Sequence, residues 1–508
     1  MAKNSIPYLN VMLPGASNAG GASSPYASVP GDDGTSGRRY TSRQVQWSGL
    51  NRSVYVDTGT LIDASGVTMK ALPYIETDNI FRRKYSYSGK KIINLTGIGD
   101  ALLVVYNDGS SVKLDVFSPA DAPSPTATGV IRNSAAGDTD YRSIVQFNVY
   151  KTPTDPIEGE FDRKILIFPD KLSMDYVTAV SGTIEFASLG DAYPDIKMAA
   201  VQDSRLFGVD DARIYASGAN DYANWDLDTA TEYSSAHAWC SPTQADSRAD
   251  GTFTAITSYG GHIVAFKDDY THELYNNKNP FYLQELFNFG AIDVRTVHEV
   301  NGRLLFVSRD GVISYGGGSP QMLDAPLCID DYTEAVCGSH QGIYYLSTRS
   351  GSDDVITYTY NSDNGEWSIN STDDVMPTGY CSVAGRLYRA HGSGIDVLDT
   401  EGYGEWFLDT DIKTGGTLDV KSLTRMLILA SMAPGSSFNA ALLSEDGSVE
   451  TLYSHTSTSG DPMRCVRLAA NNNMRHCHRL RLYGNGLVRI HNMEMVYRTG
   501  GRLYGDTT

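Results

Sequence analysis

The chain has 508 residues, of which 41% are hydrophobic, and its formal net charge at pH 7 is −19. This length predicts more than one folding unit, and the hydrophobic fraction excludes a wholly disordered chain. No apolar run approaches the roughly 20 residues that a membrane-spanning helix needs, and the acidic balance argues against binding to nucleic-acid phosphates over most of the surface.

Residues 1–52 are predicted to form an N-terminal arm. The part from 14 to 42 consists mostly of Gly, Ser, Ala, Pro and Asn, which bury too little apolar surface to offset their ordering entropy. We expect this part to be flexible on its own or to dock on neighbouring subunits, with Tyr26 as an anchor and Arg38 and Arg39 as candidate interaction residues. The first residues lack the apolar core of a secretion signal, so folding is expected in a cytoplasm.

Residues 53–412 are predicted to form a β-propeller of about seven blades, together with its lead-in strands. Short alternating runs rich in Val, Ile, Tyr and Thr are separated by Asp-Gly, Asn-Gly and Gly-Gly turns, and no sustained helical period is present. Similar hairpins recur about every 47 residues, a spacing typical of propeller blades. Their first apolar residues are Leu102, Ile165, Leu206, Ile263, Leu304, Ile343 and Leu387. We expect each hairpin to be the inner pair of strands of one blade.

Residues 413–508 no longer follow this period, and their alternating strands predict a small C-terminal β-sandwich. This part carries 11 Lys and Arg against 7 Asp and Glu, so it is basic whereas the middle of the chain is acidic. Arg479 and Arg481 alternate with Leu480 and Leu482, which gives that strand one basic and one apolar face. The basic face is either a solvated surface or an interaction surface.

Catalytic chemistry is not predicted. The sequence lacks G-x-S-x-G, H-E-x-x-H and P-loop motifs, and we assign no catalytic, metal or cofactor residues. Paired carboxylates such as Asp210-Asp211 recur at turns, where Asp bonds to its own backbone. Trp367 is expected to pack between sheets, and the six cysteines are expected to be buried thiols.

The stretch from Ala200 to Trp225 carries a more specific pattern. Its strand and loop resemble the "R-[IL]-Y-x-S-G" and "D-x-x-N-W" signature of phage virion proteins known as tail, tail-hub (nozzle) or packaged-DNA stabilisation proteins. Residues 53–83 and the C-terminal strands also resemble that family. The signature residues, to which we assign a structural role, are Arg213, Ile214, Tyr215, Ser217, Gly218, Asp221, Asn224 and Trp225.

The resemblance implies a structural, non-enzymatic virion protein of a phage tail or neck, assembled in the host cytoplasm. It implies a hexameric or otherwise ring-like homo-oligomer that contacts portal, adaptor or other tail proteins and helps to retain or conduct the genome. Packaged DNA would pass without sequence recognition, and an acidic channel would not hold it. The alternative is a glycan-binding or glycan-cleaving propeller that contacts the host surface.

Overall fold

The computed structural model describes residues 27–28, 39–44, 50, 52, 61, 63–134, 141, 143–150, 161–227, 236–241, 251–276, 279–329, 331–349, 354–410, 421–443, 449–468, 474–475 and 479–499. Within these ranges, nearly all regular structure is β. The helical elements there are α1 (Tyr176–Val180) and the short 3-10 helix η2 (Val294–Thr296). The prediction of an all-β chain with little helix is confirmed.

Seven sheets in the described part of the chain have four antiparallel strands each. The first contains β7 (Lys91–Ile98), β8 (Ala101–Asn107), β9 (Val112–Phe117) and β10 (Ala127–Arg132); the second contains β11 (Ser143–Tyr150), β12 (Phe161–Phe168), β13 (Leu172–Asp175) and β14 (Ala187–Ser188). The third contains β15 (Met198–Gln202), β16 (Arg205–Val209), β17 (Ile214–Ala216) and β18 (Trp239–Cys240); the fourth contains β19 (Phe253–Tyr259), β20 (His262–Lys267), β21 (Thr271–Tyr275) and β22 (Tyr282–Phe287).

The remaining three follow in chain order. The fifth contains β23 (His298–Val300), β24 (Arg303–Val307), β25 (Val312–Tyr315) and β26 (Gln321–Met322); the sixth contains β27 (Val336–His340), β28 (Ile343–Arg349), β29 (Val355–Asn361) and β30 (Glu366–Asp373). The seventh contains β31 (Pro377–Val383), β32 (Arg386–His391), β33 (Gly394–Tyr403) and, from far earlier in the chain, β6 (Asn79–Ser86).

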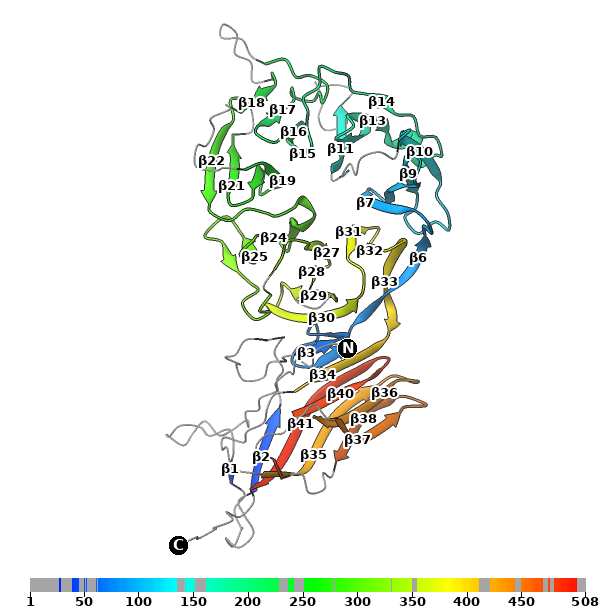
Figure 1. The fold of residues 1–508 in the computed structure, drawn as a ribbon, viewed down its shortest axis with the longest axis vertical. Helices are drawn as coiled ribbons and strands as arrows, with labels where there is room; N and C mark the ends of the chain where they lie inside the picture. Colours follow the sequence, from blue (N-terminus) through cyan, green and yellow to red (C-terminus); the bar gives the residue numbers. More distant parts are fainter. Residues whose placement is uncertain are drawn as a thin grey trace.

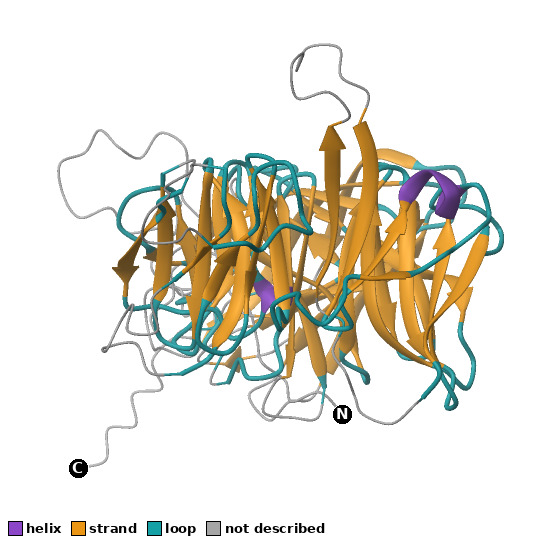
Figure 2. Ribbon diagram, turned by 90° about the horizontal axis from the view of Figure 1, so that it is seen from above, coloured by secondary structure: helices purple, strands orange, loops and turns teal. Residues whose placement is uncertain are grey.

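The seven sheets are arranged in a ring, as in a β-propeller (Figure 1). Figure 2 shows their strands standing side by side, with the loops gathered at both ends. The first strands of successive sheets contact one another, for example β7 with β31 and β27 with β31, so these strands face the ring centre. The repeated hairpins supply the second and third strands of each sheet, for example β24 and β25. The expectation that they form the inner pair is therefore wrong.

The turns between strands follow the local sequence. Asn301 and Gly302 join β23 to β24 and have φ values of 48° and 73°. Positive φ at both central residues is what a two-residue type I′ hairpin turn requires, and Asn and Gly tolerate it best. The Asn-Gly pairs therefore predict where these strands reverse.

Two further sheets lie beside the ring, at the lower end of Figure 1. One has eight strands: β1 (Ala27–Ser28), β2 (Arg39–Gln44), β4 (Val67–Thr68), β5 (Ile75–Thr77), β35 (Lys421–Met432), β38 (Asp461–Leu468), β39 (Met474–Arg475) and β41 (Val488–Thr499). The other has five: β3 (Asp63–Ser65), β34 (Glu405–Asp409), β36 (Ser437–Leu443), β37 (Val449–Thr456) and β40 (Arg479–Asn485).

Both ends of the chain build these two sheets, which differs from the expected boundaries. Residues 39–44 pair along β41 instead of belonging wholly to a free arm, and β3 pairs with β34. β34 also precedes residue 413, where the C-terminal unit was expected to begin. The physical reason is that β41 and β34 have backbone edges that need partners, and N-terminal segments supply them.

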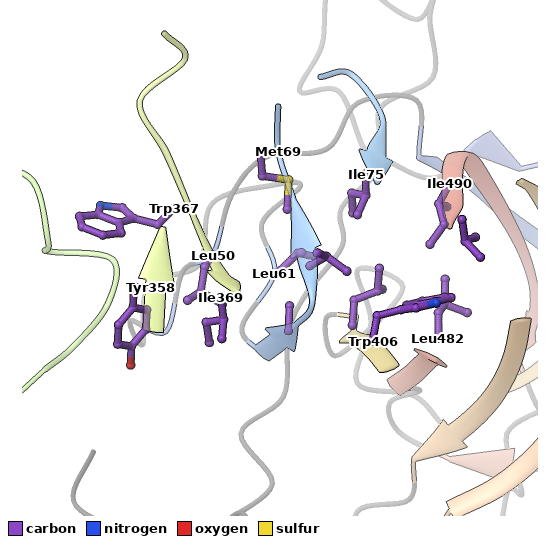
Figure 3. Close-up of a cluster of buried hydrophobic side chains, with 14 of the residues drawn as sticks. Leu50, Leu61, Met69, Ile75, Tyr358, Trp367, Ile369, Trp406, Leu482 and Ile490 are labelled. Carbon is purple, nitrogen blue, oxygen red and sulfur yellow. The ribbon is translucent and has the colours of Figure 1, made fainter. Parts of the chain in front are cut away.

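One buried apolar cluster connects the ring with these two sheets (Figure 3). Trp367 and Ile369 come from the sixth sheet of the ring, and Leu482 and Ile490 come from the two C-terminal sheets. Between them lie residues of the N-terminal segment, including Leu61, which is fully buried. The ring and the C-terminal sheets therefore share a core and pack as one body.

Trp367 is only 2% exposed, and its Nε1 donates a hydrogen bond to the carbonyl oxygen of Leu323 at 2.8 Å. Its predicted packing role between sheets is confirmed. The expectation for the cysteines is confirmed for Cys337 and Cys381, which are buried. It is wrong for Cys328 and Cys465, which are exposed, and for Cys240, which is half-buried, whereas Cys477 lies outside the described residues. Cys465 is exposed whereas its neighbour Val466 on β38 is buried, because successive side chains of a strand point to opposite faces of the sheet.

Candidate functional site

The signature strand and loop form a hydrogen-bonded corner of the third sheet. The Asp210 carboxylate accepts the backbone N–H groups of Ala212 and Arg213 at 2.7 and 2.6 Å. The Tyr215 hydroxyl donates to the same carboxylate at 2.8 Å. Burial and this bond raise the pKa of Tyr215 to about 12. Asp210 therefore ties the turn to the strand that carries the signature.

The loop after this strand closes on itself. Gly218 N–H donates to the Asn224 carbonyl oxygen at 2.8 Å, and a Cβ at Gly218 would lie 2.9 Å from Asn224 Nδ2. The Asp221 carboxylate accepts the backbone N–H of Ala223. The Trp225 ring packs edge-on against Tyr193, with 5.0 Å between ring centroids.

Ser217 and Arg205 hold the base of the same loop. Ser217 is fully buried, and its Oγ accepts the backbone N–H of Leu206 at 3.0 Å. Arg205 is 2% exposed and donates to the carbonyl oxygens of Ser217 and His237. The signature residues thus lie together as packing and loop-closing groups. Sequence reasoning missed the role of Arg205, which is the first residue of β16, the strand that pairs with the signature strand β17.

Several of the acidic turn residues bond to their own backbone, as predicted for this class. Asp210 does so as described above, and Asp331 accepts the backbone N–H of Thr333 at 2.8 Å. Other members of the class make ion pairs instead. Asp268 pairs with Arg309 at 3.0 Å and Asp373 with Arg389 at 2.8 Å. In both roles these carboxylates are engaged in holding turns and strands.

The predicted interaction residues divide into two groups. Tyr26 and Arg38 lie outside the described residues, and Arg39 is paired by its backbone with Arg498 in the eight-stranded sheet. Arg479 and Arg481 lie on β40, where they are half-buried on the face opposite the buried Leu480 and Leu482. The predicted alternation along this strand is confirmed.

Arg481 is neutralised by a carboxylate on the neighbouring strand. Its Nε and Nη2 donate to Asp409 Oδ1 and Oδ2, both at 2.5 Å. Asp409 is fully buried, and burial raises its pKa to about 6, although Arg481 opposes this shift. Arg481 also lies over the Phe407 ring, 4.9 Å from its centroid. It is therefore a fixed and paired group and not a free positive charge.

Arg481 borders a hollow of about 620 Å³ on the outer face of the five-stranded sheet, our candidate site. Three adjacent strands supply a row of side chains that runs across the centre of the hollow. Phe407 on β34 is in register with Tyr483 on β40, and Tyr483 is in register with Asn439 on β36. Beside this row lie Ser437, Asn485 and Glu405, which also border the hollow.

Sequence reasoning singled out Arg481 but missed Phe407, Tyr483 and Asn439. The alternation in "EWFLD" and "RLRLYGN" places Phe407 and Tyr483 on the face opposite buried neighbours, which was an available signal. What could not be read was that β34, β40 and β36 are adjacent, because their positions in the sequence are far apart.

Two further observations apply to the described ranges alone. They contain no cluster of three or more His, Cys, Asp and Glu side chains arranged to hold a metal ion. No helix there has both the length and the apolar character needed to cross a membrane.

Comparison with known proteins finds no matching family model and no matching curated protein. Among solved structures, the extracellular domain of a hybrid two-component system from B. thetaiotaomicron is 10% identical, with a TM-score of 0.38. That match covers 65% of this chain and 44% of the other, so the chain spans less than half of that structure. An exo-beta-1,3-galactanase from Phanerochaete chrysosporium is 11% identical over 88% of this chain and 100% of the other, with a TM-score of 0.26. Similarities at this level carry no argument about function.

Proposed function

We propose that the chain is a structural virion protein of a bacteriophage tail or neck, a tail-hub or nozzle component that forms a ring-like homo-oligomer. The observation that carries this proposal is the signature between Arg213 and Trp225. Its residues are all present in the sequence, and they act together as one packed corner of a sheet. Such a use fits a scaffold, since Ser217, Asp221 and Asn224 hold the loop by hydrogen bonds.

In this proposal the seven four-stranded sheets are the seven blades of a closed propeller, and the two remaining sheets form a C-terminal β-sandwich. Support for closure comes from β6, which adds the outer strand to the seventh sheet. Support for the sandwich comes from buried side chains of both C-terminal sheets, such as Leu482 and Ile490, in one apolar cluster. Edges joined in this way give a rigid body suited to repeated packing in a ring.

The scaffold would contact portal, adaptor or other tail proteins and help to retain or conduct the packaged genome. The net charge of −19 suits this role, because an acidic wall repels DNA and lets it slide without sequence recognition. We propose no enzymatic activity, since the turn carboxylates described above are engaged in hydrogen bonds and ion pairs.

Electron microscopy of intact particles from the source, labelled with gold-conjugated antibody to this chain, tests the proposal. Label at the neck or tail is expected. Sedimentation of the purified chain, alone and with particle components, then measures whether it forms a ring. Absence of the chain from purified particles would overturn the virion assignment.

A further inference from the structure

We propose that the hollow on the five-stranded sheet is a binding site for a neutral oligosaccharide. The inference rests on the residues of β34, β36 and β40 and does not depend on the virion role. It concerns the C-terminal sheets and not the ring, where the alternative glycan-binding function was expected.

An aromatic row forms the floor of the site. Tyr483 and Phe407 are direct neighbours on adjacent strands and both point to the outer face, opposite the buried Leu482 and Trp406. Both rings are only half-buried, so part of each remains available. An aromatic ring offers a flat apolar surface, and the C–H face of a pyranose is apolar and similar in size. The row can therefore hold sugar rings by their faces.

Polar groups surround the row at the positions that hydroxyl groups of a sugar would reach. The Asn439 Nδ2 group donates to the Tyr483 carbonyl oxygen at 3.3 Å, which fixes the amide and leaves its Oδ1 as an acceptor. Ser437 Oγ accepts the backbone N–H of Asn485 at 2.9 Å and keeps its own O–H to donate. A few fixed polar groups around an apolar floor are typical of a ligand site.

The charges around the hollow favour a neutral ligand. The Arg481 guanidinium donates two of its five N–H groups to the Asp409 carboxylate, and the negative charge of this carboxylate balances the positive charge of Arg481. Glu405 lies on the opposite side of the aromatic row and is exposed. Among the described residues that border the hollow, an anionic ligand would meet this carboxylate with the Arg481 charge already paired, whereas sugar hydroxyls can bond to both groups.

The site is also pre-organised. Phe407, Tyr483 and Asn439 lie in the interior of paired strands, and the guanidinium of Arg481 is held from one side by Asp409 and rests on Phe407. Binding therefore requires little ordering of side chains, which lowers its entropic cost.

The test uses the full chain on an array of neutral oligosaccharides of glucose, galactose and N-acetylglucosamine, with uronic-acid and sialylated counterparts beside them. Soluble forms of the bound glycans are then titrated by calorimetry. We expect a neutral oligosaccharide to bind, and Tyr483→Ala to weaken that binding by about tenfold or more through loss of the aromatic surface. Tyr483→Phe should retain most of it, because the ring face remains.

Tyr282→Ala is the matched control, because Tyr282 is 63% exposed and lies on β22 of the ring, in a different sheet. It should leave glycan binding unchanged. The proposal is overturned if no neutral oligosaccharide binds at millimolar concentration, if anionic glycans are preferred, or if Tyr483→Ala binds as well as the wild type. It is also overturned if Tyr483→Ala changes only the sedimentation coefficient, since the hollow would then be a contact between copies of the chain.

Discussion

Arg83 and Asp396 are 313 residues apart in the sequence, yet their Nε and Oδ1 atoms lie 2.6 Å apart. The pair joins β6 to β33 and so links an early segment to the last sheet of the ring. Asp396 Oδ2 also lies 3.4 Å from Nη2 of the buried Arg389 and 3.3 Å from Nδ1 of His391. One carboxylate therefore holds two arginines and a histidine where the ring closes.

Replacing Asp396 by Ala should destabilise the protein more than replacing Arg83 by Ala. The Asp396 side chain is 7% exposed and its loss leaves Arg389 buried with one remaining carboxylate partner, at a cost of about 2–3 kcal/mol. Arg83 is 43% exposed, so its loss should cost about 1 kcal/mol or less. Melting midpoints of the two variants measure this difference, and equal midpoints would contradict it.

The pH dependence of stability should contain a component from Asp409 with an unusual sign. Its pKa is about 6 in the folded chain against 3.8 normally, so between these values the folded state binds more protons than the unfolded state. Stability from this group is present at about pH 4 and declines by up to about 3 kcal/mol as the pH rises through 6.

Asp409→Asn is the variant that isolates this component, because Asn has a similar shape and does not titrate. Urea-unfolding midpoints measured at intervals of pH should decline less steeply for the variant than for the wild type in this range. Parallel pH profiles of the two proteins would show that the Asp409 carboxyl has no raised pKa.

Acidification below the ordinary carboxyl range should act in the opposite direction through Asp396. Burial alone would raise its pKa, but the hydrogen bond from His391 and the charges of Arg389 and Arg83 lower it below 3.8. Stability from this group is present above the unfolded pKa and is lost as the pH falls through the lower folded pKa. Asp396→Asn should therefore lose less stability on acidification than the wild type, as measured by the same unfolding midpoints.

Gly218→Ala should destabilise the signature corner by about 1–3 kcal/mol, because the added Cβ would lie 2.9 Å from Asn224 Nδ2 and 3.0 Å from Asn224 Cβ. Gly379→Ala is the control, since a Cβ at Gly379 meets nothing within 4 Å. Thermal melting compares the two. A Gly218→Ala protein that melts with the control would mean that the loop adapts without cost.

Truncation tests the role of the N-terminal strands. Removing residues 1–26 should leave the melting midpoint nearly unchanged, because every described strand remains. Removing residues 1–44 deletes β1 and β2 and exposes an edge of β41, so a lower midpoint and aggregation are expected. Light scattering during melting measures both effects, and identical behaviour of the two truncations would refute the strand's role.

Deleting residues 14–42, the part of the arm defined by its composition, would cut into β2, whose pairs run from Arg39 with Arg498 to Gln44 with Met493. A deletion that ends before Ala27 spares both β1 and β2 and so separates the arm from the strands. If this shorter deletion leaves the monomer folded and weakens its assembly with particle components, the docking role of the arm is supported; unfolding of the monomer would contradict it.

The local features of this protein follow from short stretches of its sequence. The seven hairpins, the Asn-Gly turns and the burial of Trp367 were all predicted, because alternation and turn residues act over a short stretch of chain. The signature corner is local too, since Asp210 and Trp225 lie within one hairpin and its loop.

The pairing of strands that are distant in the sequence is seen only in the folded chain. β6 in the seventh sheet, β2 on β41 and the pairing of Asp409 with Arg481 all join segments with long stretches of chain between them. Such pairings depend on which sheet edges remain open once the local hairpins have formed, and several edges compete for each strand. The hollow with Phe407, Tyr483 and Asn439 follows from that choice, and so it could not be read from any single segment.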